Sequence, residues 1–279
     1  MDKGIRGALI RAVREAARAE IMPRFRRLAS GDVAAKTSAT DLVTLADTRA
    51  EAHIRAAVAR ILPEARCVGE EGVAEAPTEL DALGQPGVCV VIDPVDGTWN
   101  FAHGLATFGT LLAVVENGAT IFGLLYDPVL DDWIEATAGG GTWYVAGDGR
   151  TRLTLGAATP AEPLVGVQAR HGLSAAQWQA SVRLHGRFAK VMTLGASLWE
   201  YRTLLTGGVG FIQNRYLKPW DHAAGVLALK EAGGYAALLD GTPYVPVLRD
   251  GYLLCARSEA LWHELAPGFA DALLGDAQK

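Results

Sequence analysis

The chain of 279 residues is 50% hydrophobic and 20% charged, a composition that fits a globular protein with a large core. A formal net charge of −5, without a block of Lys and Arg, argues against nucleic acid as a partner. Residues 1–20 lack the apolar stretch of a signal peptide, and no apolar run is long enough to span a bilayer. We therefore expect a cytoplasmic protein that does not act at a membrane.

The N-terminal part is predicted to be helical. Apolar residues at helical spacing indicate one amphipathic helix over residues 3–29, and the polar segment 31–41 that follows is typical of a loop. Asp47 is placed to cap a second helix that continues to about Leu62, because Pro63 disfavours further helix.

Short strands separated by turns are predicted in the middle of the chain. Apolar segments at 67–68 and 88–92 are typical of strands, and a Gly-Glu-Glu-Gly loop follows the first of them. Residues 111–115 and 120–126 flank an Asn-Gly turn, a strong signal for a β-hairpin. The strands that extend this meander are predicted near 132–137 and 142–146.

The second half of the chain alternates strands with helices. This pattern predicts an α+β first half and an α/β second half, in one unit with two lobes, 1–150 and 151–279, and a boundary within 147–163. The predicted strands lie near 164–168, 188–193, 209–213, 235–239 and 252–256, and the predicted helices near 174–186, 196–206, 221–232 and 258–274.

The three cysteines give no sign of a disulfide framework. Cys67, Cys89 and Cys255 are odd in number, far apart in the sequence and set among apolar residues. We predict that all three are reduced thiols in the core.

Two aspartates stand where the strand at 88–92 ends. Pro94 cannot donate to a sheet, so we expect it to end the strand and let Asp96 fold back beside Asp93. Two carboxylates at that distance repel unless a cation lies between them. Mg²⁺ prefers such oxygen ligands, and the carbonyl of Val95 is a natural third. The alternative is an Asp-Pro turn followed by an ordinary helix cap.

A helical turn is predicted to open at Gly97-Thr98, directly after these aspartates. Its free amide hydrogens would form an anion site beside the metal. A metal next to an anion site indicates phosphate chemistry.

Further acids stand at element ends elsewhere in the chain. Glu70 and Glu71 follow a short strand, and Asp221 stands at a helix start between Trp220 and a run of small residues. Each has an ordinary alternative: a solvated loop for the glutamates and a helix cap for Asp221. The small residues suggest a helix that starts in a crowded place.

Four segments resemble those of the inositol monophosphatase family in order and spacing, and the likeness covers nearly the whole chain. It implies a layered αβαβα sandwich of the sugar-phosphatase type, and a Mg²⁺-dependent, lithium-sensitive phosphomonoesterase that is often a homodimer. Members of the family act on inositol phosphates, fructose 1,6-bisphosphate, histidinol phosphate or nucleotide bisphosphates. The segments are DLVTLAD (41–47), GEEG (69–72), DPVDGTWNF (93–101) and WDHAAG (220–225).

The resemblance also implies roles for individual residues. Two or three Mg²⁺ ions would be held mostly by the N-terminal lobe, with one ligand from the C-terminal lobe. Asp47 and Thr98, with Glu70, would orient and deprotonate the attacking water, and the amides of Gly97 and Thr98 would hold the phosphate. The implied metal ligands are Glu70, Asp93, the carbonyl of Val95, Asp96 and Asp221.

The substrate pocket departs from the family pattern. Asn214 stands where inositol phosphatases usually carry a glutamate, so the charge expected beside the substrate's hydroxyls is missing there. The adjacent Arg215 either favours a second anionic group or is a surface charge. Trp99 either walls the pocket or packs, and Lys36 either helps to place a third metal or is solvated. The implied substrate contacts are Gly97, Thr98, Gly195, Ala196, Asn214 and Asp221.

These features predict Mg²⁺-dependent hydrolysis of a small phosphorylated metabolite, in particular an inositol-1-phosphate-like polyol phosphate, by water. One alternative is a phosphatase of the same family that acts on histidinol phosphate, fructose 1,6-bisphosphate or a nucleotide bisphosphate. The other is a non-catalytic binding protein on this fold, which a lost metal ligand would indicate. None of the implied ligands is missing.

Overall fold

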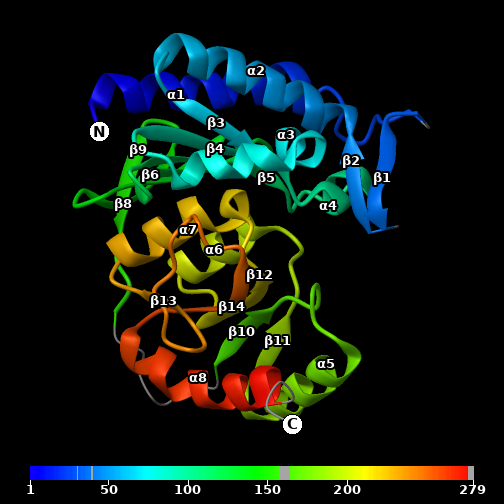
Figure 1. The fold of residues 1–279 in the computed structure, drawn as a ribbon, viewed down its shortest axis with the longest axis vertical. Coiled ribbons are helices and arrows are strands. Elements are labelled where there is room, and N and C mark those ends of the chain that lie inside the picture. The colour runs from blue at the N-terminus through cyan, green and yellow to red at the C-terminus, as the bar shows by residue number, and fades with distance from the viewer. Residues whose placement is uncertain (30, 39, 157–163, 276–279) are drawn as a thin grey trace.

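The computed structural model describes residues 1–29, 31–38, 40–156 and 164–275. Helices and sheets stack in five layers, in the order helix, sheet, helix, sheet, helix, which confirms the predicted αβαβα sandwich (Figure 1). The outer layer holds α1 (Lys3–Ala16) and α2 (Leu45–Ile61), the middle layer α6 (Ser197–Leu205) and α7 (Pro219–Glu231), and the far layer α5 (Ala175–Val182) and α8 (Glu259–Leu274). No helix in the described ranges is both long and apolar enough to cross a membrane.

The first sheet has seven strands in the order β3-β4-β5-β6-β7-β8-β9. Only β3 and β4 run parallel to each other, and each later strand is antiparallel to its neighbour. The predicted hairpin is confirmed, with Asn117 and Gly118 both at positive φ in its turn. The strands are β3 (Arg66–Gly69), β4 (Val88–Asp96), β5 (Gly109–Glu116), β6 (Ala119–Asp127), β7 (Asp132–Thr137), β8 (Gly141–Ala146) and β9 (Gly149–Leu153).

The second sheet has five strands in the order β11-β10-β12-β14-β13, and all five were predicted. The change from one sheet to the other falls between Leu153 and Val165, a segment that overlaps the predicted boundary at 147–163, while residues 157–163 lie outside the described ranges. The division into two lobes stays a prediction. The strands are β10 (Val165–Gln168), β11 (Lys190–Met192), β12 (Phe211–Tyr216), β13 (Tyr235–Leu238) and β14 (Asp250–Ala256). The shorter helices are α3 (Glu70–Glu75), α4 (Thr98–Ala102), a π turn (Ala17–Ile21) and two 3₁₀ segments (Pro77–Gly84 and Arg183–Arg187).

Two predictions for the N-terminal region are wrong. The first helix does not reach residue 29, because α1 passes into the π turn and the helical structure stops just before Pro23. The segment 31–41 is not a loop, since β1 (Val33–Ser38) pairs antiparallel with β2 (Asp41–Thr44). Most of the β1 side chains are exposed, so the strand lacks the apolar alternation that would have revealed it.

The prediction that Pro94 ends its strand is also wrong. β4 continues to Asp96, and its pairing with β5 shifts register between Asp93 and Asp96. The carbonyl of Pro94 accepts a hydrogen bond from the Thr110 hydroxyl at 2.9 Å. An irregular register accommodates a residue without an amide hydrogen inside a central strand. The cysteine prediction is confirmed, because all three are free thiols.

The helices of the middle layer are tightly packed against the first sheet and against each other. A Cβ added at Gly123 of β6 would lie 2.8 Å from backbone atoms of Ala224 in α7. A Cβ added at Gly225 would lie 2.2 Å from the ring of Tyr201 in α6. The small residues after Asp221 thus mark a crowded helix, as the sequence suggested.

Gly225→Ala should destabilise the protein by roughly 1–3 kcal/mol, because the ring of Tyr201 is fully buried and has no room to move. Gly186→Ala is the matched control, since nothing lies within 4 Å of a Cβ at that position. Urea unfolding of both variants measures the difference. Equal stability of the two variants would contradict the packing argument.

Candidate active site

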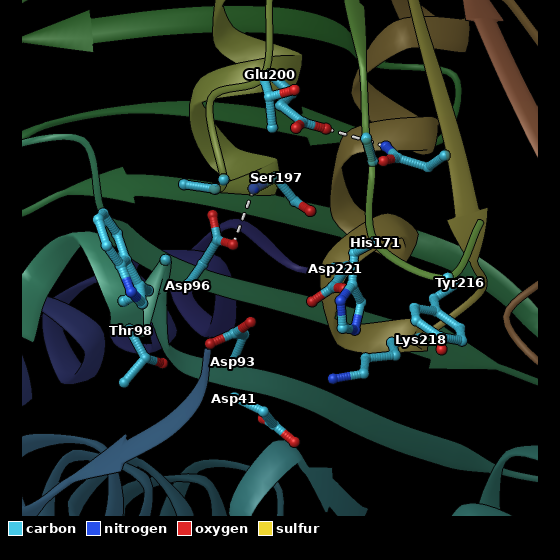
Figure 2. A pocket seen from close by; sticks show the side chains of 18 of the residues that line it. Asp41, Asp93, Asp96, Thr98, His171, Ser197, Glu200, Tyr216, Lys218 and Asp221 are labelled. Carbon is cyan, nitrogen blue, oxygen red and sulfur yellow. Dashed lines mark hydrogen bonds between the residues drawn. The ribbon is translucent and has the colours of Figure 1, made fainter. Parts of the chain in front are cut away.

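Three carboxylates, of which Asp93 and Asp96 are buried and Asp221 is half-buried, meet at the floor of one pocket (Figure 2). Asp93 and Asp96 come from the irregular end of β4, and Asp221 comes from the first turn of α7. One oxygen of each lies within 4.8 Å of the others. Burial and the neighbouring carboxylates raise the pKa of Asp93 and of Asp96 well above the ordinary value. An oxygen of Asp93 is buried without a hydrogen-bond partner, so this donor set fits a divalent cation.

The carboxylate of Asp96 is fixed by the start of α6. The amides of Ser197 and Leu198 donate to its two oxygens at 2.9 and 2.6 Å. The positive end of a helix dipole favours a negative charge at this position. This contact also joins the first sheet to the middle layer at the pocket.

Asp221 is not the cap of its helix, which corrects that interpretation, whereas Asp47 takes part in capping α2 without being the N-cap residue. Lys218 is the N-cap of α7 and Pro219 its first residue, so Asp221 lies inside the first turn. Thr44 is the N-cap of α2, and Asp47 is the third helical residue of a reciprocal capping box. The carboxylate of Asp221 is therefore available to the pocket.

Thr98 lies between Asp47 and the backbone of β4. Its hydroxyl oxygen is 3.0 Å from Oδ1 of Asp47 and 3.0 Å from the carbonyl oxygen of Val95. A single hydroxyl proton can serve only one of these acceptors at a time. Asp47 is fully buried, and burial raises its pKa to about 7. Asp47 and Val95 lie behind the pocket lining, whereas Thr98 is part of it.

Glu70 and Glu71 open helix α3 and do not form a solvated loop, so that alternative is wrong. The carboxylate of Glu51 accepts hydrogen bonds from the amides of Glu71 and Gly72 at 2.8 and 2.9 Å. Glu51 is buried and also binds Arg55. Glu51 therefore positions the start of α3. The sequence gave no hint of this contact, because Glu51 lies on a different helix, α2.

Two lysines offset the charge of these glutamates. Nζ of Lys36 lies 3.2 Å from Oε1 of Glu70 and 2.7 Å from Oε1 of Glu71. Nζ of Lys218 lies 3.9 Å from the same oxygen of Glu70. Glu70 lines the pocket beside the three aspartates but outside their 4.8 Å group. Lys36 is therefore an ion-pair partner at the site and is not a solvated side chain.

The pocket has a volume of about 680 Å³ and receives residues from both sheets and from α6 and α7. Gly97 is at φ 84°, and a Cβ there would lie 2.8 Å from Cβ of Ala196, so the turn before α4 needs glycine. Of the residues singled out in the sequence, these line the pocket: Glu70, Asp93, Asp96, Gly97, Thr98, Gly195, Ala196, Asn214 and Asp221.

Arg215 and Trp99, whose roles the sequence left undecided, both line the pocket and differ in their surroundings. Arg215 forms an ion pair with Asp250, and its guanidinium lies 4.6 Å from the ring centroid of Tyr252. Its charge is already compensated, which favours the surface-charge interpretation. Trp99 is 41% exposed, stacks on His103 with ring centroids 4.0 Å apart, and lines the pocket.

Sequence reasoning missed Glu200 of α6. It is 3% exposed, lines the pocket, and accepts a hydrogen bond from Nδ2 of Asn214 at 3.0 Å. Burial raises its pKa to about 7. An acid one turn after the Gly195-Ala196 turn, in a helix that is otherwise mostly apolar, was the available signal.

Comparison with known proteins gives consistent matches. A model of the inositol monophosphatase family matches residues 3–273. A fructose-1,6-bisphosphatase/inositol-1-monophosphatase of Thermotoga maritima is 30% identical over 210 residues, covering 75% of this chain and 76% of that protein. An inositol-1-monophosphatase of Bacillus subtilis is 30% identical over 212 residues, covering 75% and 77%.

Solved structures share the fold. A Thermotoga maritima IMPase matches with a TM-score of 0.79 and 26% identity, covering 94% of this chain and 95% of that one. The suhB protein of Bartonella henselae matches with a TM-score of 0.80 and 21% identity, covering 96% and 98%. Because the Bartonella henselae protein is only 21% identical to this chain, its likeness concerns the fold alone.

In the presence of EDTA, Asp93→Asn should raise the free energy of unfolding by roughly 1–3 kcal/mol, because it removes one of three neighbouring like charges in the pocket floor. Asp148→Asn is the control, since Asp148 is exposed in a turn. Urea unfolding at neutral pH measures both variants against the parent protein. An Asp93→Asn variant no more stable than the parent would show that repulsion does not strain the metal-free site.

Proposed function

Because the chain belongs to the inositol monophosphatase family, and is therefore a phosphoric monoester hydrolase, we propose that it hydrolyses the monophosphate of a small polyol with Mg²⁺ as its cofactor. The observation that carries this proposal is the group of three carboxylates, two buried and one half-buried, whose oxygens lie within 4.8 Å of one another in the pocket floor. Only a cation with a preference for oxygen ligands would turn that repulsion into binding.

The residues that would hold Mg²⁺ are Asp93, Asp96 and Asp221, with Glu70 and the Val95 carbonyl as further ligands. The unpartnered oxygen of Asp93 supports this assignment, because such an atom costs free energy unless something binds it. When bound, Mg²⁺ supplies charge neutralisation of the phosphate and a lower pKa for a coordinated water.

Thr98 and Asp47 would orient the attacking water and take its proton. The Thr98 hydroxyl lies 3.0 Å from Asp47, so the proton would pass to the Asp47 carboxylate. A base with a pKa raised to about 7 is well matched to neutral pH. The amides of Gly97 and Thr98 would face the phosphate, and water would displace the alcohol in line.

The charges around the pocket favour a substrate with a single phosphate. Arg215 is neutralised by Asp250, and Lys36 and Lys218 lie against Glu70. Most of the pocket's cations are therefore already paired, and Arg170 is the lining guanidinium that forms no ion pair within the described residues, since it donates to the carbonyl of Leu173. Histidinol phosphate, fructose 1,6-bisphosphate and nucleotide bisphosphates are the alternatives, and a non-catalytic binding protein is a further one. Family likeness also supports a cytoplasmic, lithium-inhibited homodimer.

The test is release of inorganic phosphate from a panel of phosphomonoesters, with and without Mg²⁺. Inositol 1-phosphate should be hydrolysed only with Mg²⁺, and faster than fructose 1,6-bisphosphate, histidinol phosphate or a nucleotide bisphosphate. Asp93→Asn should abolish turnover while the protein stays folded, because the pocket floor then loses a ligand. Near-normal Mg²⁺-dependent activity of that variant, or preference for a bisphosphate, would overturn the assignment.

Thr98→Ala should lower kcat by about 10²–10⁴-fold, the usual contribution of proton transfer to a positioned base. Mg²⁺ binding, measured by calorimetry, should change little. Thr98→Ser keeps the hydroxyl and is the matched control, with most of the rate retained. A raised KM with an unchanged kcat in Thr98→Ala would make Thr98 a binding residue instead.

A further inference from the structure

The wall of the pocket holds a carboxylate that the acid cluster does not use. Glu200 projects from α6 on the same side as Ser197, and a dashed line marks its hydrogen bond to Asn214 (Figure 2). Glu200 is 3% exposed and Asn214 is 7% exposed, yet both line the pocket. An acid and an amide buried together at a substrate pocket call for an explanation beyond packing.

The hydrogen bond fixes which atom Asn214 offers to a ligand. An ionised carboxylate accepts hydrogen bonds and does not donate them, so in that state the amide nitrogen of Asn214 faces Glu200, which is the arrangement in the structure. The nitrogen lies 3.0 Å from Oε2 of Glu200. Among the described residues, no group donates to the amide oxygen of Asn214, which leaves that oxygen as an acceptor.

Both partners are held in place by their surroundings. The side chain of Gln213 donates to the backbone carbonyl of Asn214 at 2.9 Å and accepts from Gln168 at 3.1 Å. Glu200 lies on the helix whose first amides bind Asp96. The amide of Asn214 is thus held at a defined place relative to the acid cluster.

From these contacts we infer that Glu200 is a positioning residue for substrate selection, which turns the oxygen of Asn214 toward a hydroxyl group of the substrate's alcohol. The inference rests on the proposed function and deepens it. The substrate class is a phosphomonoester whose alcohol carries at least one further hydroxyl group. The family pattern predicts a carboxylate at position 214. Here Glu200 supplies a carboxylate from behind Asn214 and acts on the substrate only through that residue.

The test compares inositol 1-phosphate with cyclohexyl phosphate, which has the same ring size and no free hydroxyl. Glu200→Leu removes the acceptor for the Asn214 amide, so the amide can turn. The KM for inositol 1-phosphate should rise about tenfold more than the KM for cyclohexyl phosphate, the scale of one hydrogen bond, with the loss in KM rather than kcat. Glu200→Gln keeps an acceptor at this position and should restore much of the selectivity.

A double variant separates positioning from direct contact. Asn214→Ala should cause the same selective rise in KM, and it serves alone if Glu200→Leu does not fold. Adding Glu200→Leu to Asn214→Ala should cost little more, because Glu200 acts through Asn214.

The outcomes distinguish the two proposals. Equal effects of these variants on the KM of both substrates, or additive losses in the double variant, would overturn the role of Glu200. The proposed function would still stand. If the parent protein hydrolyses neither compound with Mg²⁺, the proposed function falls and this inference with it.

Discussion

Repulsion among Asp93, Asp96 and Asp221 is the constraint on which the site and its surroundings depend. Like charges whose oxygens lie within 4.8 Å of one another in a pocket floor are costly, and for two of the three a neighbouring group offsets the charge. Two amides of α6 bind Asp96, and Lys218 lowers the pKa of Asp221 against the effect of burial. Asp93 has an oxygen with no partner at all. These contacts support the proposed cation, because a bound cation would offset the remaining repulsion.

The same constraint explains the close packing of the middle layer. The aspartates come from the first sheet and from α7, so that helix must approach the sheet closely enough to bring Asp221 to the end of β4. Gly123 opposite Ala224 allows the approach, and Gly225 makes room for Tyr201 of α6. α6 in turn must present its first amides to Asp96. Small residues in the WDHAAG segment therefore serve the geometry of the floor, although they carry no chemistry.

Local signals predicted most of the fold, and contacts between distant segments account for the misses. The Asn-Gly hairpin and the alternating strands and helices of the second half depend on residues close in sequence. The hairpin of β1 and β2 is mostly polar, so hydrophobic periodicity gave no signal. Glu51 reaches α3 across 20 residues, and Glu200 meets Asn214 across 14. Such buried polar pairs show in a sequence only as single charged or polar residues.

The floor and the wall of the pocket come from different parts of the chain, and this separation bears on how substrate preference is set. The acids of the floor lie on β4 and α7, whereas the Glu200–Asn214 pair joins α6 to β12. The two groups meet at the first turn of α6, whose amides bind Asp96 and which also carries Glu200. A change in the wall can therefore alter which alcohol is accepted without moving a carboxylate of the floor. Position 214 illustrates this separation. Asn214 stands there in place of the expected glutamate, the acid cluster of the floor is intact, and the carboxylate of Glu200 lies behind Asn214.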